Sequence, residues 1–149
     1  MNVDDFKKKF SIAGGKVLSR SRNKYRNQKV VVDGITFHSK KESEFYTALK
    51  IKQKAGIIKD FEKQVKYDIS VNGIHIANYF LDFKVINLDG TINYYDVKGK
   101  DKVTGKWITT DVFALKKKLV EAIYGIKIEK VWVTGLQIQI NGMTLGLIL

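Results

Sequence analysis

The chain has 149 residues and carries 27 Lys and Arg against 15 Asp and Glu, which gives a formal charge of +12 at pH 7. A charge excess of this size predicts a polyanionic partner such as nucleic acid. The chain has no cysteine and only two histidines, so disulfide scaffolds, thiol catalysis and cysteine-based zinc sites are excluded. Any metal chemistry would therefore use oxygen ligands.

The length and the 44% of hydrophobic residues suit a single core. Residues 1–24 are predicted to form a basic, flexible arm, because residues 1–29 hold nine Lys and Arg against two Asp. Residues 25–149 are predicted to form one domain. No apolar run reaches the roughly 20 residues of a membrane span, and the N-terminus lacks the apolar stretch of a signal peptide. We therefore expect a cytoplasmic protein with no membrane partner.

The first ordered elements are predicted to be a hairpin and a helix. Two short apolar runs within residues 30–37 flank an Asp-Gly pair, which favours a two-residue hairpin turn. Ser39 and Glu42 have the spacing of a capping box and predict a helix that ends near Gly56. The apolar residues that follow at helical spacing place Glu42 on the buried face of this helix.

Alternating apolar residues and turn signals then predict strands at 64–71, 74–86, 91–98 and 126–133. The first three form an antiparallel meander, and residues 99–106 form a basic loop. A second helix, capped by Thr110 or Asp111, ends at Gly125.

The buried face of this second helix is predicted to hold Val112, Leu115, Leu119 and Ile123. A strand–helix–strand order favours a parallel or mixed pairing for the strand at 126–133. The tail at 136–149 alternates again, either as a final core strand or as a dimer interface. The expected fold class is α/β, with a mixed sheet and two helices.

Two carboxylates are predicted to lie side by side. Asp96 and Lys98 share one face of their strand, because side chains alternate along a strand. If the turn before that strand has three residues, with Gly90 left-handed, Asp82 lies opposite Asp96. A slip of one residue would move Asp82 to the other face, so the candidate site depends on this turn.

Asp82, Asp96 and the main-chain carbonyl of Val97 would form an oxygen site suited to Mg²⁺, for which Mn²⁺ substitutes. Lys98 would orient a water molecule or neutralise charge on a phosphate. This combination predicts phosphodiester hydrolysis. Each residue also has a structural explanation: Glu42 closes a capping box, and Asp96 with Lys98 forms a solvated ion pair. An Asp at position 82, within an apolar strand, is the hardest of these to explain by structure alone.

The chain resembles the PD-(D/E)XK nuclease superfamily, the fold of restriction enzymes and archaeal Holliday-junction resolvases. It is closest in pattern to a small phage-encoded, resolvase-like branch. The resemblance extends over about residues 24–133 and rests on a set of short motifs: Tyr25-Arg26-Asn27, Asp33-Gly34-Ile35-Thr36-Phe37, Ser39-Lys40-Lys41-Glu42, Gln64, Leu81-Asp82-Phe83, Asp96-Val97-Lys98-Gly99 and Leu115-Lys116-Lys117-Lys118-Leu119. Position 81 is Leu where the superfamily formula has Pro.

The resemblance implies a restriction-endonuclease-like fold, with a central mixed sheet flanked by helices, and metal-dependent cleavage of DNA. Asp82 and Asp96 would be the metal ligands, Lys98 the catalytic lysine and Glu42 a supporting acid that reaches the metal directly or through water. The predicted DNA contacts are Arg20, Arg22, Lys24, Tyr25, Arg26, Lys40, Lys41, Lys100 and Lys116. Trp107 would pack in the core or stack on a splayed base.

The sequence therefore predicts a Mg²⁺-dependent endonuclease that cleaves branched DNA such as a Holliday junction. Two symmetric cuts would require a homodimer. The expected setting is a bacterium that carries the phage or prophage. The alternatives are a phage nuclease that acts on linear or nicked duplex DNA, and a non-catalytic DNA-binding module on the same fold.

Overall fold

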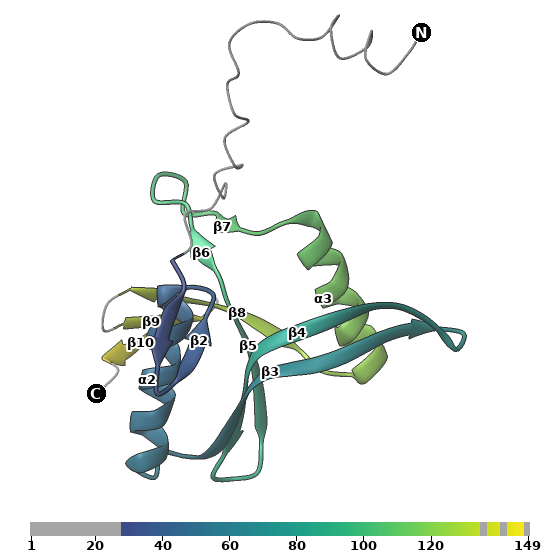
Figure 1. Ribbon diagram of the computed structural model, residues 1–149. Helices are drawn as coiled ribbons and strands as arrows, with labels where there is room; N and C mark the ends of the chain where they lie inside the picture. The colour runs from purple at the N-terminus through teal and green to yellow at the C-terminus, as the bar shows by residue number, and fades with distance from the viewer. Residues whose placement is uncertain (1–27, 135–136, 141–142, 148–149) are drawn as a thin grey trace, which may run out of the picture.

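A six-stranded mixed sheet with two helices forms the α/β core of the protein (Figure 1). The computed structural model describes residues 28–134 and 137–140 with their side chains, and the backbone of 143–147. In spatial order the strands of the sheet are β10 (Met143–Leu147), β9 (Gln137–Ile140), β8 (Ile128–Thr134), β5 (Ile92–Val97), β4 (Ile74–Asn87) and β3 (Ile58–Val71). The helices are α2 (Lys40–Lys54) and α3 (Asp111–Tyr124), and two short hairpins pair β1 (Val30–Val32) with β2 (Ile35–Phe37) and β6 (Gly99–Lys100) with β7 (Trp107–Ile108).

The predicted mixed pairing is confirmed. Strands β5 and β8 run parallel, with Tyr94 opposite Ile128, and the other strand pairs of the described sheet run antiparallel. Helix α3 lies in the connection between β5 and β8, as a parallel pair requires. The tail extends this sheet as β9 and β10. Within the described residues, no helix is long and apolar enough to cross a membrane.

Local sequence signals place both helices as predicted. Ser39 caps α2, and its hydroxyl accepts a hydrogen bond from the Glu42 amide at 3.2 Å. Thr110 caps α3 in the same way through the Phe113 amide at 3.1 Å. Helix α3 ends at Gly125, whose left-handed backbone (φ 63°) suits a residue without a side chain.

Strand β4 turns over between residues 81 and 83. Phe83 and Val85 pack in a cluster with α2, whereas Tyr79 and Leu81 pack in a second cluster with Val120 of α3. Side chains two residues apart would face the same way in a regular strand, so the long β3–β4 ribbon must twist between them. Asp82 lies at this twist, at the junction of the two clusters.

The twist coincides with an unusual backbone on the neighbouring strand. Gln64 has a positive φ of 52° and lies across from Asp82, between the pairs Lys63–Phe83 and Val65–Leu81. A residue with a side chain adopts this conformation at a cost, and such strain concentrates at functional sites. Strand β3 also begins at Ile58, six residues earlier than predicted, because five of the six residues at 59–64 are polar and exposed and only Phe61 packs inward.

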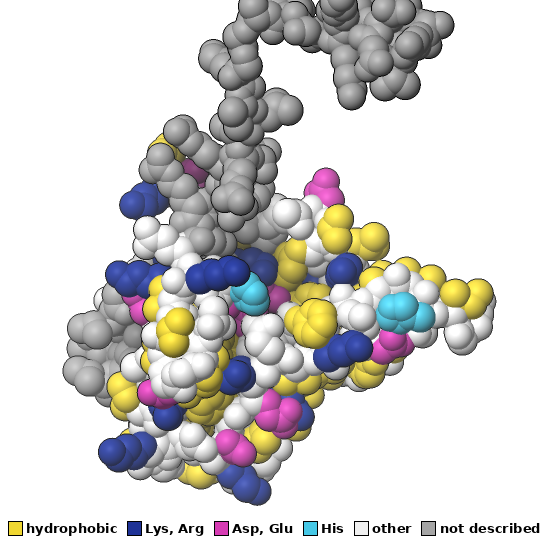
Figure 2. All heavy atoms as spheres, in the orientation of Figure 1, with side chains coloured by type: hydrophobic (Ala, Val, Ile, Leu, Met, Phe, Trp, Pro, Cys, Tyr) yellow, Lys and Arg dark blue, Asp and Glu magenta, His cyan; other side chains and the backbone are white. Residues whose placement is uncertain are grey.

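The predicted buried face of α3 is wrong for three of its four residues. Val112, Leu115 and Ile123 are exposed to 62%, 60% and 45%, whereas Leu119 is partly buried against the core and Val120 is fully buried. Phe113 lies over the Asp96 region and the sheet instead, so the helix is rotated about its axis relative to the prediction. Figure 2 shows the resulting hydrophobic surface in yellow, together with exposed apolar residues of the β3–β4 ribbon.

Parts of the predictions fall outside the described residues. These parts are the arm at 1–24 with Arg20, Arg22 and Lys24, the DNA contacts Tyr25 and Arg26, and residues 136, 141–142 and 148–149 of the tail.

The β4–β5 turn offers a test of the register. Gly90 has φ 85°, and a Cβ there would meet no atom within 4 Å, so Gly90→Ala introduces backbone strain without a clash. We predict a loss of about 1 kcal/mol in the free energy of unfolding, measured by urea denaturation. Leu88→Ala, at a residue 65% exposed in the same turn, should change stability little. Equal stability of Gly90→Ala and wild type would contradict the assigned turn.

Candidate active site

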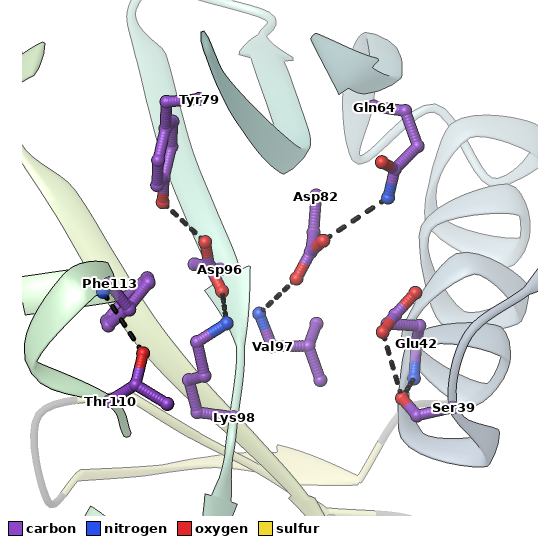
Figure 3. Close-up of polar contacts among 10 residues, drawn as sticks. All are labelled: Ser39, Glu42, Gln64, Tyr79, Asp82, Asp96, Val97, Lys98, Thr110 and Phe113. Atoms are coloured by element: carbon purple, nitrogen blue, oxygen red, sulfur yellow. Dashed lines mark hydrogen bonds and ion pairs between the residues drawn. The ribbon is translucent and has the colours of Figure 1, made fainter. Parts of the chain in front are cut away.

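Four predicted residues meet where the two halves of the core join (Figure 3). Glu42 lies in the first turn of α2, Asp82 in β4, Asp96 near the end of β5, and Lys98 directly after β5. Asp82 lies between Asp96 and Glu42 in this view, and Lys98 extends toward Asp96. The charges of Asp96, Glu42 and Lys98 all act on Asp82.

The β4–β5 register agrees with the one that the site requires. The paired residues run from Ile86–Ile92 to Phe83–Tyr95, and Asp82 and Asp96 are the next residues beyond this last pair. The Asn87 amide donates to the Thr91 carbonyl at 2.9 Å, which closes a three-residue turn with Gly90 left-handed. The two carboxylates therefore belong to the same face of the sheet, as predicted.

Asp82 is held by two hydrogen bonds. Its Oδ2 accepts from the Val97 amide at 2.8 Å, and its Oδ1 accepts from Gln64 Nε2 at 3.3 Å. Burial raises the pKa of the Asp82 carboxyl well above its usual value, and the negative charges of Asp96 and Glu42 raise it further. The Lys98 ammonium and the Val97 amide act in the opposite direction without offsetting this rise.

Asp96 is buried and fully engaged. It is 2% exposed, its Oδ2 accepts from the Tyr79 hydroxyl, and its Oδ1 contacts the Lys98 ammonium. Burial and the nearby Asp96 charge raise the pKa of Tyr79, so this phenol remains a donor at neutral pH. The solvated ion pair considered from the sequence is therefore wrong, because the Asp96 side chain is 3% exposed.

Lys98 is positioned from two sides. Its ammonium contacts Asp96 and lies 4.2 Å from the centroid of the Phe113 ring on α3. The attraction between a cation and a ring face strengthens when the cation is removed from water, and the Lys98 side chain is 24% exposed. The inward orientation of Phe113 accounts for the exposure of Val112 and Leu115, which lie on other sides of α3.

Glu42 combines the capping role with a free oxygen. Its Oε1 accepts from the Ser39 hydroxyl at 3.1 Å, which completes the capping interaction. Its Oε2 is buried and has no hydrogen-bond partner among the described residues. Burial raises the pKa of the Glu42 carboxyl. A buried carboxylate oxygen without a donor is costly unless a ligand, a proton or water completes it.

The donor set suits a hard divalent cation. Asp82 and Asp96 have the carboxylates for it, and the main-chain carbonyl of Val97 is the further ligand that the sequence predicts. Within the described part of the chain, no three His, Cys, Asp or Glu side chains form a metal-binding group by themselves. Two carboxylates and a carbonyl, with Glu42 behind them, match Mg²⁺, which keeps several water ligands rather than entering an all-protein cage.

The predicted DNA contacts on the described residues lie in different settings. Lys40 is exposed and pairs with Glu44 at 3.8 Å. Lys41 Nζ donates to the Val133 carbonyl at 2.7 Å. Lys100 lies against two tryptophan rings. Lys116 Nζ donates to the Asn78 carbonyl at 3.0 Å, so its ammonium is engaged on β4 rather than among the carboxylates.

Three residues of the site carried no predicted role. Gln64 was part of the motif set, but its hydrogen bond to Asp82 depends on a left-handed backbone that no sequence pattern signals. Tyr79 and Phe113 read as ordinary core aromatics. Tyr79 and Asp82 are three positions apart and would face opposite sides of a regular strand, so the turning of β4 brings the Tyr79 hydroxyl to the carboxylate face.

The chain belongs to the DUF1064 family, described as a protein family of unknown function, whose model matches residues 22–137. No curated protein and no solved structure matches the chain. The match covers every described residue of the candidate site, from Ser39 to Phe113.

The raised pKa of Asp82 predicts a stability gain on substitution. The unfolded chain ionises this group near the ordinary value of 3.8, whereas the folded chain holds the proton to higher pH. Wild-type stability therefore falls as pH rises between these two values. In EDTA at pH 7, the free energy of unfolding of Asp82→Asn should exceed that of wild type by roughly 1 kcal/mol.

Urea denaturation from acidic to neutral pH measures this difference, which should widen as the pH rises. Asp101→Asn is the matched control, because hydrogen bonds from Thr104 and Val103 lower the pKa of Asp101 and its substitution should not stabilise. An Asp82→Asn protein less stable than wild type at neutral pH would show that the buried carboxylate is not under electrostatic strain.

Proposed function

We propose that this protein is a divalent-metal-dependent DNA endonuclease with a restriction-endonuclease-like arrangement of its core. The observation that carries the proposal is the pair of the partly buried Asp82 and the buried Asp96 beside Lys98, in a chain with a net charge of +12. Carboxylates gathered at one buried position raise their own free energy, and a cation offsets that cost. The basic surface around them suits a phosphate backbone.

Each side chain has a role that its contacts support. Tyr79 and Lys98 orient Asp96, while Gln64 and the Val97 amide orient Asp82. A bound Mg²⁺ would supply Lewis acidity between these two carboxylates.

The Lys98 ammonium is the group that would neutralise charge developing on the scissile phosphate. In the reaction, a bond forms between a water oxygen and phosphorus, and the ester bond to the leaving sugar oxygen breaks. The free Oε2 of Glu42 is suited to accept a hydrogen bond from a water molecule.

Branched DNA remains the leading substrate. A compact basic domain can select DNA by its shape rather than by its sequence. Symmetric cutting of a four-way junction needs two active sites, so a homodimer is part of this proposal. Equal cutting of linear duplex would favour the duplex nuclease instead, and a monomeric molar mass in solution with DNA would remove the resolvase.

Substitutions at the site distinguish an enzyme from a DNA-binding module. With Mg²⁺ and a four-way junction, Asp82→Asn and Lys98→Met should each slow cleavage by about 10²-fold or more. Asp82→Asn removes a carboxylate that would hold the cation, and Lys98→Met removes the positive charge that would face the phosphate. Gel-shift assays in EDTA should show that both variants still bind the junction. Asp101→Asn and Lys84→Met are the matched controls. Asp101 is hydrogen-bonded to Thr104 and Val103, and Lys84 is paired with Glu62 on the β3–β4 ribbon, so neither belongs to the carboxylate cluster.

Wild-type protein that binds every DNA tested but cleaves none, with either Mg²⁺ or Mn²⁺, would contradict the nuclease. The non-catalytic DNA-binding module would then be the remaining function. Full activity of Lys98→Met would remove the assigned role of the lysine while leaving the metal site in place.

The dependence on Mg²⁺ should itself vary with pH. A proton on Asp82 competes with the cation, and burial raises the pKa of this group above its ordinary value. The Mg²⁺ concentration that gives half-maximal cleavage should therefore increase as the pH falls through that raised pKa. Initial rates across a Mg²⁺ series at each pH measure it. A half-saturating concentration that stays constant until the pH approaches 3.8 would contradict the raised pKa.

A further inference from the structure

A second cluster of chemistry-bearing side chains lies beside the candidate site. It consists of two indoles and three ammonium groups, here called the tryptophan–lysine patch: Trp107, Trp132, Lys41, Lys100 and Lys130. Lys100 lies between the rings, 4.5 Å from the Trp107 centroid and 5.3 Å from the Trp132 centroid. Lys130 lies 5.2 Å from Trp107, and Lys41 lies 5.3 Å from Trp132.

The patch carries positive charge without acidic partners. Among the described ion pairs, none joins Lys41, Lys100 or Lys130 to a carboxylate within 4 Å. Burial lowers the pKa of Lys130, and the charges of Lys117 and Lys100 lower it further. Ammonium groups that are partly removed from water and repel one another would be stabilised by an anion.

The two rings add a second kind of recognition. Trp107 and Trp132 are partly exposed rather than buried in the core, so neither is explained by core packing alone. Indole faces stack on nucleobases irrespective of sequence, because every base has a π face. Ammonium groups beside aromatic faces match a nucleotide, which has a phosphate next to a base.

The position of the patch relates it to the carboxylate site. Strand β6 begins directly after Lys98, and Lys100 follows two residues later. Two residues of extended chain span about 7 Å, which corresponds to about two nucleotides along a DNA strand. Figure 1 shows the β6–β7 hairpin continuing from the end of β5, away from the far end of α2.

We propose that the tryptophan–lysine patch binds an unpaired nucleotide adjacent to the phosphate that is cut. The lysines would contact its phosphate, and Trp107 or Trp132 would stack on its base. The inference rests on the proposed nuclease function for the identity of the nucleic acid. It goes further by selecting DNA that is unpaired next to the cut site, as at a branch, flap or gap, over continuous duplex.

The protein contains its own reporter, because Trp107 and Trp132 are the two tryptophans of the whole chain. Titration of the full chain in EDTA with a short oligothymidylate should quench tryptophan fluorescence. An oligonucleotide of the same length with abasic sites carries the same phosphates, and it should bind about 10-fold more weakly with little quenching. Equal quenching and equal affinity for both oligonucleotides would overturn base stacking.

Ring substitutions separate stacking from a structural role in the β6–β7 hairpin. At least one of the variants Trp107→Leu and Trp132→Leu should bind oligothymidylate about 10-fold more weakly than wild type. The corresponding Phe variants should keep most of the affinity. Each Phe variant also leaves one tryptophan, which assigns the quenching to a ring. If neither Leu variant weakens binding while circular dichroism remains native, the patch is structural and the proposal fails.

Charge substitutions test the phosphate contact. Lys100→Gln should reduce the slope of log affinity against log salt by about 0.7 for single-stranded DNA. Lys54→Gln removes the same charge from the opposite end of α2 and should leave the slope unchanged, since Lys54 is exposed and remote from the patch (Figure 1). An equal change in both variants would reduce the role of Lys100 to general surface charge.

This test is separable from that of the nuclease. Asp82→Asn should quench and bind as wild type does, because the patch does not use the carboxylate. Quenching with no cleavage by any form of the protein would contradict the nuclease function and support nucleotide binding by the patch. Normal cleavage with no preference for unpaired DNA, in both wild type and the Leu variants, would support the nuclease function and contradict nucleotide binding by the patch.

Discussion

The site depends on one unfavourable contact, between the partly buried Asp82 carboxylate and the buried Asp96 carboxylate. Two carboxylates removed from water oppose each other's ionisation, and a fold keeps them only if surrounding groups hold both in place. The Val97 amide, Gln64 and Tyr79 supply that support from three different strands. Much of the local architecture follows from it, including the twist of the β3–β4 ribbon and the left-handed backbone of Gln64.

The lysines complement this negative centre in two ways. Lys98 is drawn inward, against Asp96 and the Phe113 ring, and offsets part of the carboxylate charge. Lys100 and Lys130 lie outward on tryptophan faces and remain without acidic partners within the described residues. Lysines that contribute to the net charge of +12 therefore have two roles. One lies inside the site beside a carboxylate, and others form a surface that suits phosphates.

Sequence reasoning succeeded where local chemistry determines structure. The Ser39 capping box, the turn at Gly90 and the Asp82–Asp96 register all follow from short-range rules. It failed where tertiary contacts choose among local options. The apolar periodicity of α3 fits two faces, and the need to place Phe113 over Lys98 selected the one that leaves Leu115 exposed. No local pattern signals the turning of β4 that brings Tyr79 to Asp96.

The central claim is that the carboxylate pair exists to hold a divalent cation, and binding of Mn²⁺ tests it most directly. Electron paramagnetic resonance counts free Mn²⁺ in the presence of the full chain, with and without a four-way junction. The account predicts bound Mn²⁺ that disappears in Asp82→Asn and in Asp96→Asn while both variants remain folded. Wild-type protein that binds no Mn²⁺ under either condition, or variants that bind it as wild type does, would contradict the account.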